Sequence, residues 1–291
     1  TMTNPLKGKK VFICADHGLA VVYFLQSDIV PELIRNGVAV IVLTDEGILP
    51  KVSRTFARPH LQFESLRLKE AKQYVKSKDP SIQWWTNFLR RVGASKRINV
   101  EALTSHVEQV GFEAGRRRKA LMPFMWALIG ILRRSRAARK WLVDFQKRYT
   151  PDLYSNLFEK HKPDLIITST PGWRLDRIIL REAARRGIPS ASVVVGWDNP
   201  SSYSLPGAPV QRITCWSEIQ KQELVQGSDW DADRVNIGGI PSYDGYFRNQ
   251  WIMKKSDYFK LHELDTRRKL LGYCCSFITF SPNYQNIEAL A

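Results

Sequence analysis

Runs of apolar, largely β-branched residues alternate with segments of helical periodicity at both ends of the chain. The run 11–15 is followed by apolar positions spaced as on one helix, through Leu25 and Ile34, which ends at Asn36-Gly37 before the run 38–43. This strand–helix–strand order predicts a right-handed crossover and hence a parallel sheet. Further strands are predicted at residues 61–64, 165–168, 191–195, 213–216, 235–237 and 276–280.

Residues 57–162 differ from both ends, because beyond one short strand they combine helical periodicity with many Lys and Arg residues. Residues 61–150 carry 20 Lys and Arg against 7 Asp and Glu, which is +13 of the chain's formal charge of +16. We therefore expect an α/β protein whose parallel sheet is interrupted by a basic helical insertion, residues 65–160. Such a concentration of positive charge favours anionic lipid head groups, nucleic acid or phosphorylated substrates as partners.

The composition narrows the class of protein. With 291 residues, of which 44% are hydrophobic, the chain can bury a large core, which argues against disorder of the whole. The four cysteines, Cys14, Cys215, Cys274 and Cys275, include no C-x-x-C pair, so we expect no metal site, no cofactor and a reducing, cytoplasmic compartment. The uncharged run 120–132 is shorter than the ~20 residues that span a bilayer, and the first residues lack a signal-peptide pattern.

Polar loops follow the predicted strands at their carboxyl ends: Asp16-His17-Gly18, Thr170-Pro171-Gly172 and Trp197-Asp198-Asn199. The carboxyl ends of parallel strands share one edge, where open α/β sheets bind ligands, so we expect these loops to line one cleft. Within it, His17 with Asp16 is the predicted general base for an acceptor hydroxyl. The alternative is that His17 only caps the helix that follows. The expected cleft residues are Asp16, His17, Thr170, Trp197, Asp198 and Asn199.

Two interpretations stay open for several of these polar residues. Asp198 and Asn199, with Ser201, either contact a ligand or only shape the turn, since Asp and Asn side chains bond their own backbone. Glu218 either binds a ligand or stabilises the positive end of the helix that it begins. Asp176 is expected to cap the helix that starts beside it.

The loop Gly196-Trp197-Asp198-Asn199, the strand end Trp216-Ser217-Glu218 and the segment Gly238-Gly239-Ile240-Pro241-Ser242-Tyr243-Asp244 follow one another along the chain. In this order they resemble bacterial glycosyltransferase-like proteins with the GT-B fold, in which a Ser-Trp-Asp-Asn loop precedes a Trp-Asn-Glu strand end and a Thr-Gly-x-x-x-x-Asp segment. The last segment resembles, more loosely, the Thr-Gly-Asn-x-x-x-Asp hinge of non-hydrolysing UDP-N-acetylglucosamine 2-epimerases, which share that fold.

The resemblance covers residues 163–285 and, in pattern only, residues 9–45. Gly196 stands where the family has Ser, and Pro200 stands where it often has Leu. The resemblance implies a Rossmann-like sheet flanked by helices, which forms the acceptor-side half of a GT-B architecture. The implied domains are 1–246 for the acceptor side, 247–275 for a linker helix and 276–291 for the start of a truncated donor domain.

The resemblance also implies a function: transfer of a sugar from a nucleotide-sugar donor to a cell-envelope or lipid-linked acceptor, with no activity in the absence of the donor domain. In such a site Trp197 would stack on a sugar ring and Asp198 would orient a sugar hydroxyl. The implied catalytic residues are His17 and Asp16; the substrate-binding residues are Gly18, Thr170, Trp197, Asp198, Asn199, Ser201 and Glu218; the hinge is Gly238, Gly239 and Pro241.

The run 120–132 is flanked by basic residues, which predicts a helix lying on an anionic membrane, at its inner face, with Met125 and Trp126 dipping into the interface. The alternative is a core helix with solvated basic ends. The expected lipid-binding residues are Arg116, Arg117, Arg118, Lys119, Arg133, Arg134 and Arg136.

Two other function classes remain open. One is a non-catalytic binding or scaffold module with a GT-B-like half-fold, and the other is a UDP-sugar epimerase-like enzyme. Nucleic acid is not an expected partner, because the chain has no helix-turn-helix, zinc-knuckle or aromatic RNA-binding strand pattern.

Overall fold

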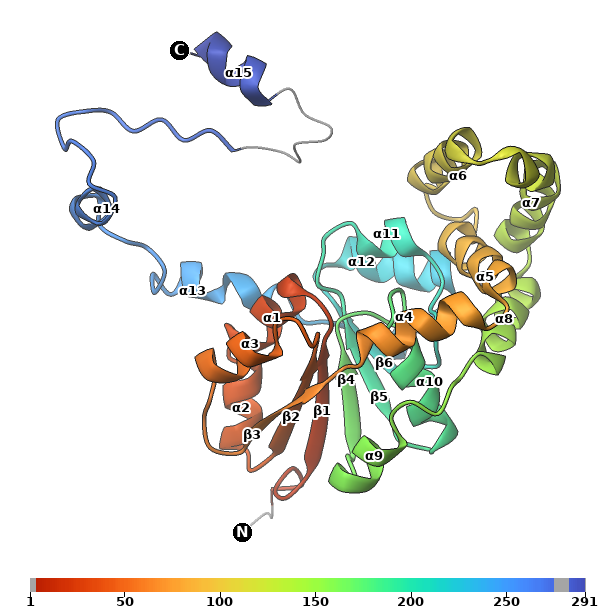
Figure 1. The fold of residues 1–291 in the computed structure, drawn as a ribbon, viewed down its shortest axis with the longest axis horizontal. Helices are drawn as coiled ribbons and strands as arrows, with labels where there is room; N and C mark the ends of the chain where they lie inside the picture. The colour runs from red at the N-terminus through yellow and green to blue at the C-terminus, as the bar shows by residue number, and fades with distance from the viewer. Residues whose placement is uncertain (1–3, 275–282, 291) are drawn as a thin grey trace. The chain divides into compact units, whose positions relative to one another are not determined.

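The computed structural model describes residues 4–274 and 283–290 (Figure 1). The chain divides into two compact units, residues 1–244 and 245–291. The first unit holds a seven-stranded sheet in which every neighbouring pair is parallel, in the order β3-β2-β1-β4-β5-β6-β7. The strands are β1 (Lys10–Ala15), β2 (Ala39–Thr44), β3 (Leu61–Ser65), β4 (Leu165–Thr168), β5 (Ser190–Val193), β6 (Arg212–Cys215) and β7 (Val235–Ile237).

This strand order makes the first unit a Rossmann-like α/β fold. The chain builds outward from β1 to β3 and then returns to place β4 on the other side of β1. The point between β1 and β4 is therefore the topological switch point, where the loops that leave neighbouring strands diverge and open a crevice. The predicted parallel sheet is confirmed, and the predicted strand 276–280 lies outside the described residues.

The sheet is buried on both faces, which explains why its strands are continuous apolar runs. Along β1, Val11 and Ile13 belong to the core on one face, whereas Phe12 and Cys14 belong to the core on the other. Helices and short helical turns of the first unit lie between the strands in sequence: α1 (Gly18–Leu25), α2 (Ile29–Arg35), α3 (Leu49–Thr55), α10 (Arg177–Arg185), α11 (Asn199–Tyr203), α12 (Glu218–Gln222), η2 (Glu223–Gly227) and η3 (Ala232–Arg234). One more turn, η4 (Pro241–Tyr243), follows β7.

The single helix predicted between the first two strands is two helices, α1 and α2. The break is at Ser27, whose hydroxyl donates to the carbonyl of Tyr23 at 2.6 Å and accepts from the amide of Ile29 at 3.3 Å. A side chain that bonds the backbone in this way competes with continuation of the helix.

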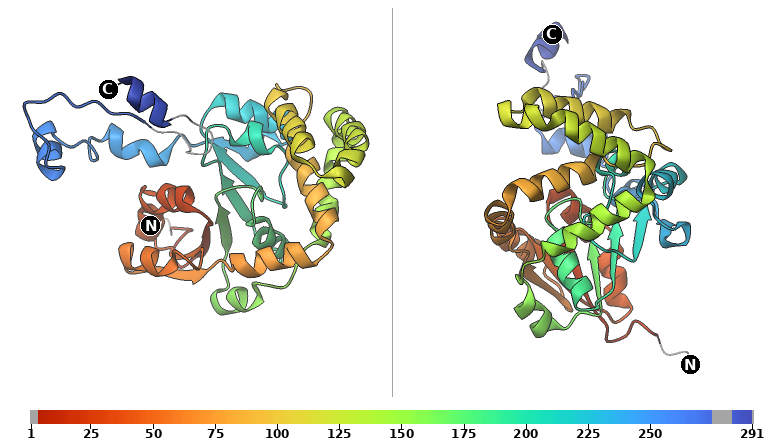
Figure 2. Two further views of the ribbon diagram at one scale, coloured as in Figure 1. Left: turned by 45° about the horizontal axis from the view of Figure 1, so that its top comes forward. Right: turned by 90° about the vertical axis from the view of Figure 1, so that its right-hand side faces the viewer.

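The predicted helical insertion is confirmed between β3 and β4. Its helices between residues 80 and 145 gather to one side of the sheet, whereas those at 68–77 and 155–161 pack on the core of the sheet (Figures 1 and 2). The insertion has an apolar core of its own, which includes Phe88, Val107 and Ile129. The buried Arg90 ties this insertion to the sheet's loops, because its guanidinium donates to carbonyls of Trp173, Tyr203 and Leu205. The insertion consists of α4 (Leu68–Ser77), α5 (Pro80–Val92), α6 (Glu101–Glu113), α7 (Arg116–Arg134), α8 (Arg136–Phe145), η1 (Gln146–Arg148) and α9 (Ser155–His161).

In its described residues, 245–274 and 283–290, the second unit is helical only in short pieces: α13 (Asp244–Phe247, which begins at the last residue of the first unit), α14 (Lys255–Leu261) and α15 (Asn283–Leu290). The predicted continuous linker helix over 247–275 is therefore corrected: within its described part, only Phe247 and α14 are helical. Asn249 and Glu263 have left-handed backbones, with φ of 57° and 53°, which a helix cannot accommodate. Most side chains of this stretch are exposed, so the helix would gain little from packing.

Candidate active site

The end of β1 carries a hydrogen-bonded acid–imidazole pair. Asp16 follows the strand directly and is buried, whereas His17 stands at the N-terminal cap of α1 with an extended backbone. The imidazole does not cap the helix; its Nδ1 lies 2.6 Å from Oδ1 of Asp16. The capping alternative for His17 is therefore wrong. Nε2 has no hydrogen-bond partner among the described residues, so it is the nitrogen left for a ligand.

Two residues from the loop after β4 hold the Asp16 carboxylate in place. Ser169 donates its hydroxyl to Oδ1 at 2.7 Å, and Arg174 donates Nε to Oδ2 at 2.8 Å. Burial raises the pKa of Asp16, but the hydrogen bonds from His17 and Ser169 and the charge of Arg174 outweigh it, so the pKa is lowered. Asp16 is thus an ionised partner for His17 across the switch point.

Sequence reasoning missed Ser169 and Arg174. The contact depends on β4 pairing with β1, with Cys14 beside Thr168, which brings Ser169 next to Asp16. No local pattern in the sequence gives this strand order. A serine directly after an apolar run was the one available signal.

Thr170 was predicted to bind substrate, and its side chain is engaged within its own loop. Its hydroxyl donates to Oδ2 of the buried Asp176 at 2.6 Å and accepts from the amide of Trp173 at 3.0 Å. Asp176 also accepts from the amide of Arg174 at 3.1 Å and does not cap α10, which corrects the expected cap. Burial, together with the nearby charge of Asp16, raises the pKa of Asp176 to about 7.

The loop after β5 displays one large ring to solvent. The side-chain amide of Gln220, on α12, donates to the carbonyls of Gly196 and Trp197 at 3.1 and 2.8 Å, so the loop backbone is pinned. The Trp197 side chain nevertheless is 76% exposed. A fixed backbone with an exposed aromatic ring suits stacking on a flat ligand.

The polar neighbours of Trp197 bond mainly to one another. Asp198 accepts from the Ser202 hydroxyl at 3.1 Å and from the Asn199 side chain at 3.4 Å, while the Ser201 hydroxyl donates to the Asp198 carbonyl at 3.0 Å. These contacts form the first turn of α11. They favour the interpretation that Asp198, Asn199 and Ser201 shape the turn, because these contacts form without a ligand.

Ser217 caps α12 and accepts from the Gln220 amide, while Glu218 lies exposed in the first turn of that helix. This arrangement matches the helix-start interpretation of Glu218. The predicted hinge lies just beyond β7: Gly238 packs so closely on Thr214 that a Cβ there would lie 2.4 Å from the threonine methyl, and Gly239 has φ of +72°. Pro241 begins η4, immediately before the division between the two units.

The predicted cleft residues thus form two groups along the carboxyl edge. One group joins Asp16 and His17 to Ser169 and Arg174; the other surrounds Trp197. β4 lies between the strands that carry them, β1 and β5. Hydrogen bonds link members within each group, and the described residues show none between the groups.

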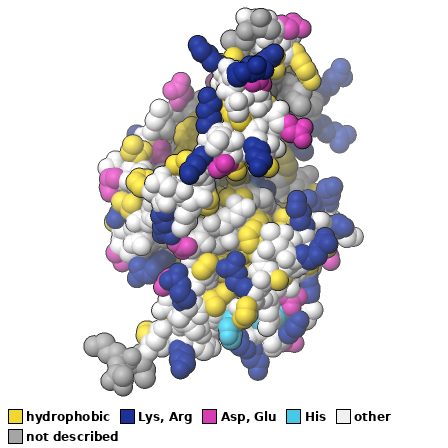
Figure 3. Space-filling view, turned by 90° about the vertical axis from the view of Figure 1, so that its left-hand side faces the viewer, with side chains coloured by type: hydrophobic (Ala, Val, Ile, Leu, Met, Phe, Trp, Pro, Cys, Tyr) yellow, Lys and Arg dark blue, Asp and Glu magenta, His cyan; other side chains and the backbone are white. Residues whose placement is uncertain are grey.

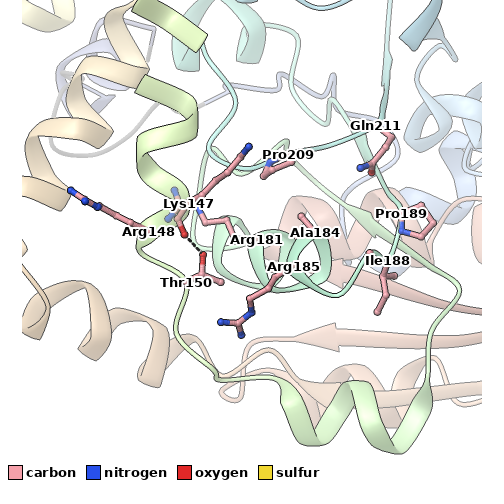
Figure 4. Close-up of a pocket in the computed structure, with 11 residues that line it drawn as sticks. Lys147, Arg148, Thr150, Arg181, Ala184, Arg185, Ile188, Pro189, Pro209 and Gln211 are labelled. Carbon is pink, nitrogen blue, oxygen red and sulfur yellow. Dashed lines mark hydrogen bonds between the residues drawn. The ribbon is translucent and has the colours of Figure 1, made fainter. Parts of the chain in front are cut away.

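A hollow of about 800 Å³ lies on the opposite, amino-terminal side of the sheet (Figure 4). Its walls include Pro189, just before β5, and Gln211, just before β6. Three of its basic side chains have partners: Arg181 donates to the carbonyls of Gly207 and Tyr149, and Lys147 and Arg185 pair with acidic residues. The fourth, Arg148, stacks over the ring of Phe145.

The helix α7 has two apolar faces. Met122, Met125, Ile129 and Leu132 pack into the core of the insertion, which corrects the prediction that Met125 dips into a membrane. Outside this buried face, Phe124 and Ile131 are exposed on one side of the helix, Leu121 is exposed at its margin, and Trp126 is partly exposed.

The basic residues at the two ends of α7 have different surroundings. At the first end, Arg118 stacks over the ring of Trp84, 4.1 Å from its centroid. At the other end, Arg133, Arg134 and Arg136 line one hollow. On the face in Figure 3, Lys and Arg are scattered among neutral surface and interspersed with Asp and Glu.

No protein-family model and no curated protein matches this chain. Within residues 4–274 and 283–290, no helix is long and apolar enough to cross a membrane. The same residues bring together no group of three His, Cys, Asp or Glu side chains suited to a metal ion.

Proposed function

We propose that this chain is the acceptor-side part of a GT-B-type glycosyltransferase, which transfers a sugar from a nucleotide-sugar to a hydroxyl of a cell-envelope or lipid-linked glycan. One observation carries the proposal: an Asp–His pair at the topological switch point, with a buried acid and a reachable imidazole. The nucleotide-sugar would be held by a second Rossmann-like domain.

In this proposal His17 Nε2 accepts the proton of the acceptor hydroxyl while the hydroxyl oxygen attacks the anomeric carbon of the donor sugar. The bond from that carbon to the diphosphate breaks, and the nucleoside diphosphate leaves with the bonding electrons. Asp16 accepts the hydrogen bond from Nδ1–H, which fixes the tautomer and stabilises the imidazolium that forms. Ser169 and Arg174 keep the Asp16 carboxylate ionised and oriented.

The exposed Trp197 supports a sugar or glycan as the acceptor, because an aromatic face pairs with the apolar face of a sugar ring. Gln220 holds the backbone beneath that ring, so little conformational freedom is lost when a ligand binds.

The outer face of α7 supports a lipid-linked acceptor at the inner, cytoplasmic surface of an anionic membrane. Phe124 and Ile131 are 59% and 54% exposed on a side of the helix that faces away from the core, and Arg or Lys residues stand at both ends of the helix. An apolar face between clusters of positive charge is typical of helices that lie in the membrane interface.

The test is turnover by the full-length protein. UDP-glucose, UDP-N-acetylglucosamine and GDP-mannose are each offered with a lipid-linked glycan extract, and released nucleoside diphosphate is measured. His17→Gln should lower kcat about 100-fold or more, as loss of a general base does. His60→Asn, an exposed residue just before β3 on the opposite edge, is the matched control and should leave kcat unchanged. Equal turnover of wild type and His17→Gln would contradict the role of His17 as the general base, whereas no turnover with any donor would favour the scaffold alternative.

A further inference from the structure

The junction of α7 and α8 encloses a second hollow, of about 460 Å³, which we call the α7–α8 hollow. The segment 95–97 and the loop 229–232 complete its walls. Two acidic side chains, Asp229 and Asp231, also line it. Its basic side chains are Lys96, Arg97, Arg133, Arg134, Arg136 and Arg139.

Fixed hydrogen bonds build the frame of this hollow. The amide of Lys96 donates to the carbonyl of Arg133 at 3.0 Å, which ties the 95–97 segment to the end of α7. The buried Arg139 donates through two nitrogens to both carboxylate oxygens of Asp229, at 2.7 and 2.8 Å, and through the third to the carbonyl of Leu132. The Asp229 carboxylate and the carbonyls of Leu132 and Arg133 therefore already accept hydrogen bonds. Because their negative charge is compensated in this way, they do not strongly repel an incoming anion.

Several donors that line this frame remain unused. Arg133 donates Nη1 to the hydroxyl of Thr104 at 3.0 Å, but its Nε and Nη2 are buried and have no acceptor among the described residues. Nε1 of Trp230 is also buried without an acceptor. The exposed side chains of Lys96 and Arg97 form no ion pair with any described residue. Buried donors without acceptors are uncommon in folded proteins, because each costs free energy.

We infer that the α7–α8 hollow binds a phosphate monoester or diphosphate group. Such a group brings about two negative charges and several acceptor oxygens, which match the guanidinium fork of Arg133 and the free ammonium of Lys96. Binding would require a rotation of the Arg133 side chain that exposes its two buried, unpaired nitrogens to the anion. The hollow lies in the helical insertion and uses none of the residues at the carboxyl edge, so the inference does not depend on the proposed glycosyl transfer.

The probe is inorganic pyrophosphate, titrated into the full-length protein at constant ionic strength while Kd and Tm are measured. Wild type should bind and gain Tm, since a ligand of the folded state stabilises it. Arg133→Gln should weaken binding about tenfold or more, as loss of charge-assisted hydrogen bonds does. Arg117→Gln is the matched control, because it removes the same charge from the same helix at its other end, and it should bind within about twofold of wild type.

Lys96→Gln is a second variant, for the case that Arg133→Gln does not fold. Because the Lys96 side chain is exposed, this substitution should leave folding intact, and it should weaken pyrophosphate binding several-fold. Vesicles then distinguish the source of the phosphate: retention on phosphatidic acid but not on phosphatidylcholine, with displacement by pyrophosphate, identifies a lipid head group. Binding of pyrophosphate without vesicle retention identifies a soluble ligand. No Tm change at millimolar pyrophosphate, or equal losses in Arg117→Gln and the two hollow variants, would overturn the inference.

Discussion

His17 turns its imidazole away from the helix that it begins and toward the preceding residue, so that Nδ1 lies 2.6 Å from Oδ1 of Asp16. The Asp16 side chain is 3% exposed and that of His17 is 19% exposed. One partner is thus held inside the protein while the other is accessible from the edge of the sheet. This difference in burial predicts that Asp16 contributes more to the stability of the fold and that His17 contributes more to the chemistry of the site.

Asp16→Asn should destabilise the protein by about 1.5–3 kcal/mol, because the buried carboxylate is the shared acceptor for His17, Ser169 and Arg174. His17→Gln should change stability by no more than about 1 kcal/mol, since its side chain is partly exposed and donates to only one partner. Urea unfolding of both variants measures the difference. Equal destabilisation would show that His17 is a structural residue.

Gly172 and Gly187 share a left-handed backbone, with φ of +80° and +70°, and differ in their surroundings. A Cβ at Gly172 would lie 2.9 Å from the amide of Ala208 and 3.0 Å from Cβ of Arg177, whereas at Gly187 nothing lies within 4 Å. Gly187→Ala should therefore cost only the backbone term of about 1–2 kcal/mol, and Gly172→Ala should cost clearly more. Thermal unfolding of the pair tests this, and equal Tm losses would contradict the close packing of the β4 loop.

Arg90 should be among the most sensitive positions outside the sheet. Arg90→Met keeps an unbranched chain in the core but leaves carbonyls of Trp173, Tyr203 and Leu205 without their buried donor, at a cost of about 3 kcal/mol or more. Arg91→Gln is the control, because Arg91 donates to a single carbonyl, that of Ser202. Urea midpoints that fall equally for both variants would argue against this link between insertion and sheet.

The strands of the sheet could be predicted from the sequence because they are buried on both faces and therefore appear as continuous apolar runs. Phe12 and Ile13, which belong to the cores on opposite faces, are an example. Periodicity failed where a side chain competes with the backbone, as Ser27 does between α1 and α2. It also failed in the described part of the predicted helix 247–275, where spacing alone indicated a helix although most side chains up to residue 274 are exposed, so that a helix there would gain little from packing.

The site was predictable only in part, for a different reason. A strand-end position is visible in sequence, so Asp16, His17 and Trp197 could be proposed. Which side chains meet across the switch point depends on strand order, which is a long-range property, and so Ser169 and Arg174 were missed. Met125 was misplaced because both faces of α7 are apolar, and the pattern does not say which face the core covers.

The outer face of α7 gives a prediction about membranes. The double substitution Phe124→Glu and Ile131→Glu should lower retention on phosphatidylglycerol vesicles about tenfold or more, because each buried side chain contributes ~2 kcal/mol. Folding should be unaffected, since both side chains are exposed. Leu19→Glu, on the exposed surface of α1, is the matched control. Unchanged retention of the double variant would remove the support for a membrane-bound acceptor.

The buried Asp176 predicts a pH dependence of stability. In the unfolded chain it titrates near 3.8, whereas in the fold burial and the charge of Asp16 raise its pKa to about 7. Between these values the folded protein binds a proton that the unfolded chain has lost, so this contribution to stability falls as pH rises from about 4 to about 7 and is constant above. The pKa of Asp16 is lowered, so its own titration lies below this range.

Asp176→Asn removes the titration and keeps the local bonds, because an amide oxygen accepts from the Arg174 amide while the Thr170 hydroxyl turns to accept from the amide nitrogen. The free energy of unfolding of the variant minus that of wild type should therefore increase from pH 5 to pH 8, by about 2.5 kcal/mol. Asp164→Asn is the control: the pKa of the exposed Asp164 is lowered, so its difference should stay flat over the same range. Urea unfolding at pH 5, 6, 7 and 8 and constant ionic strength measures both, and a flat difference for Asp176→Asn would mean that Asp176 is already ionised at pH 5.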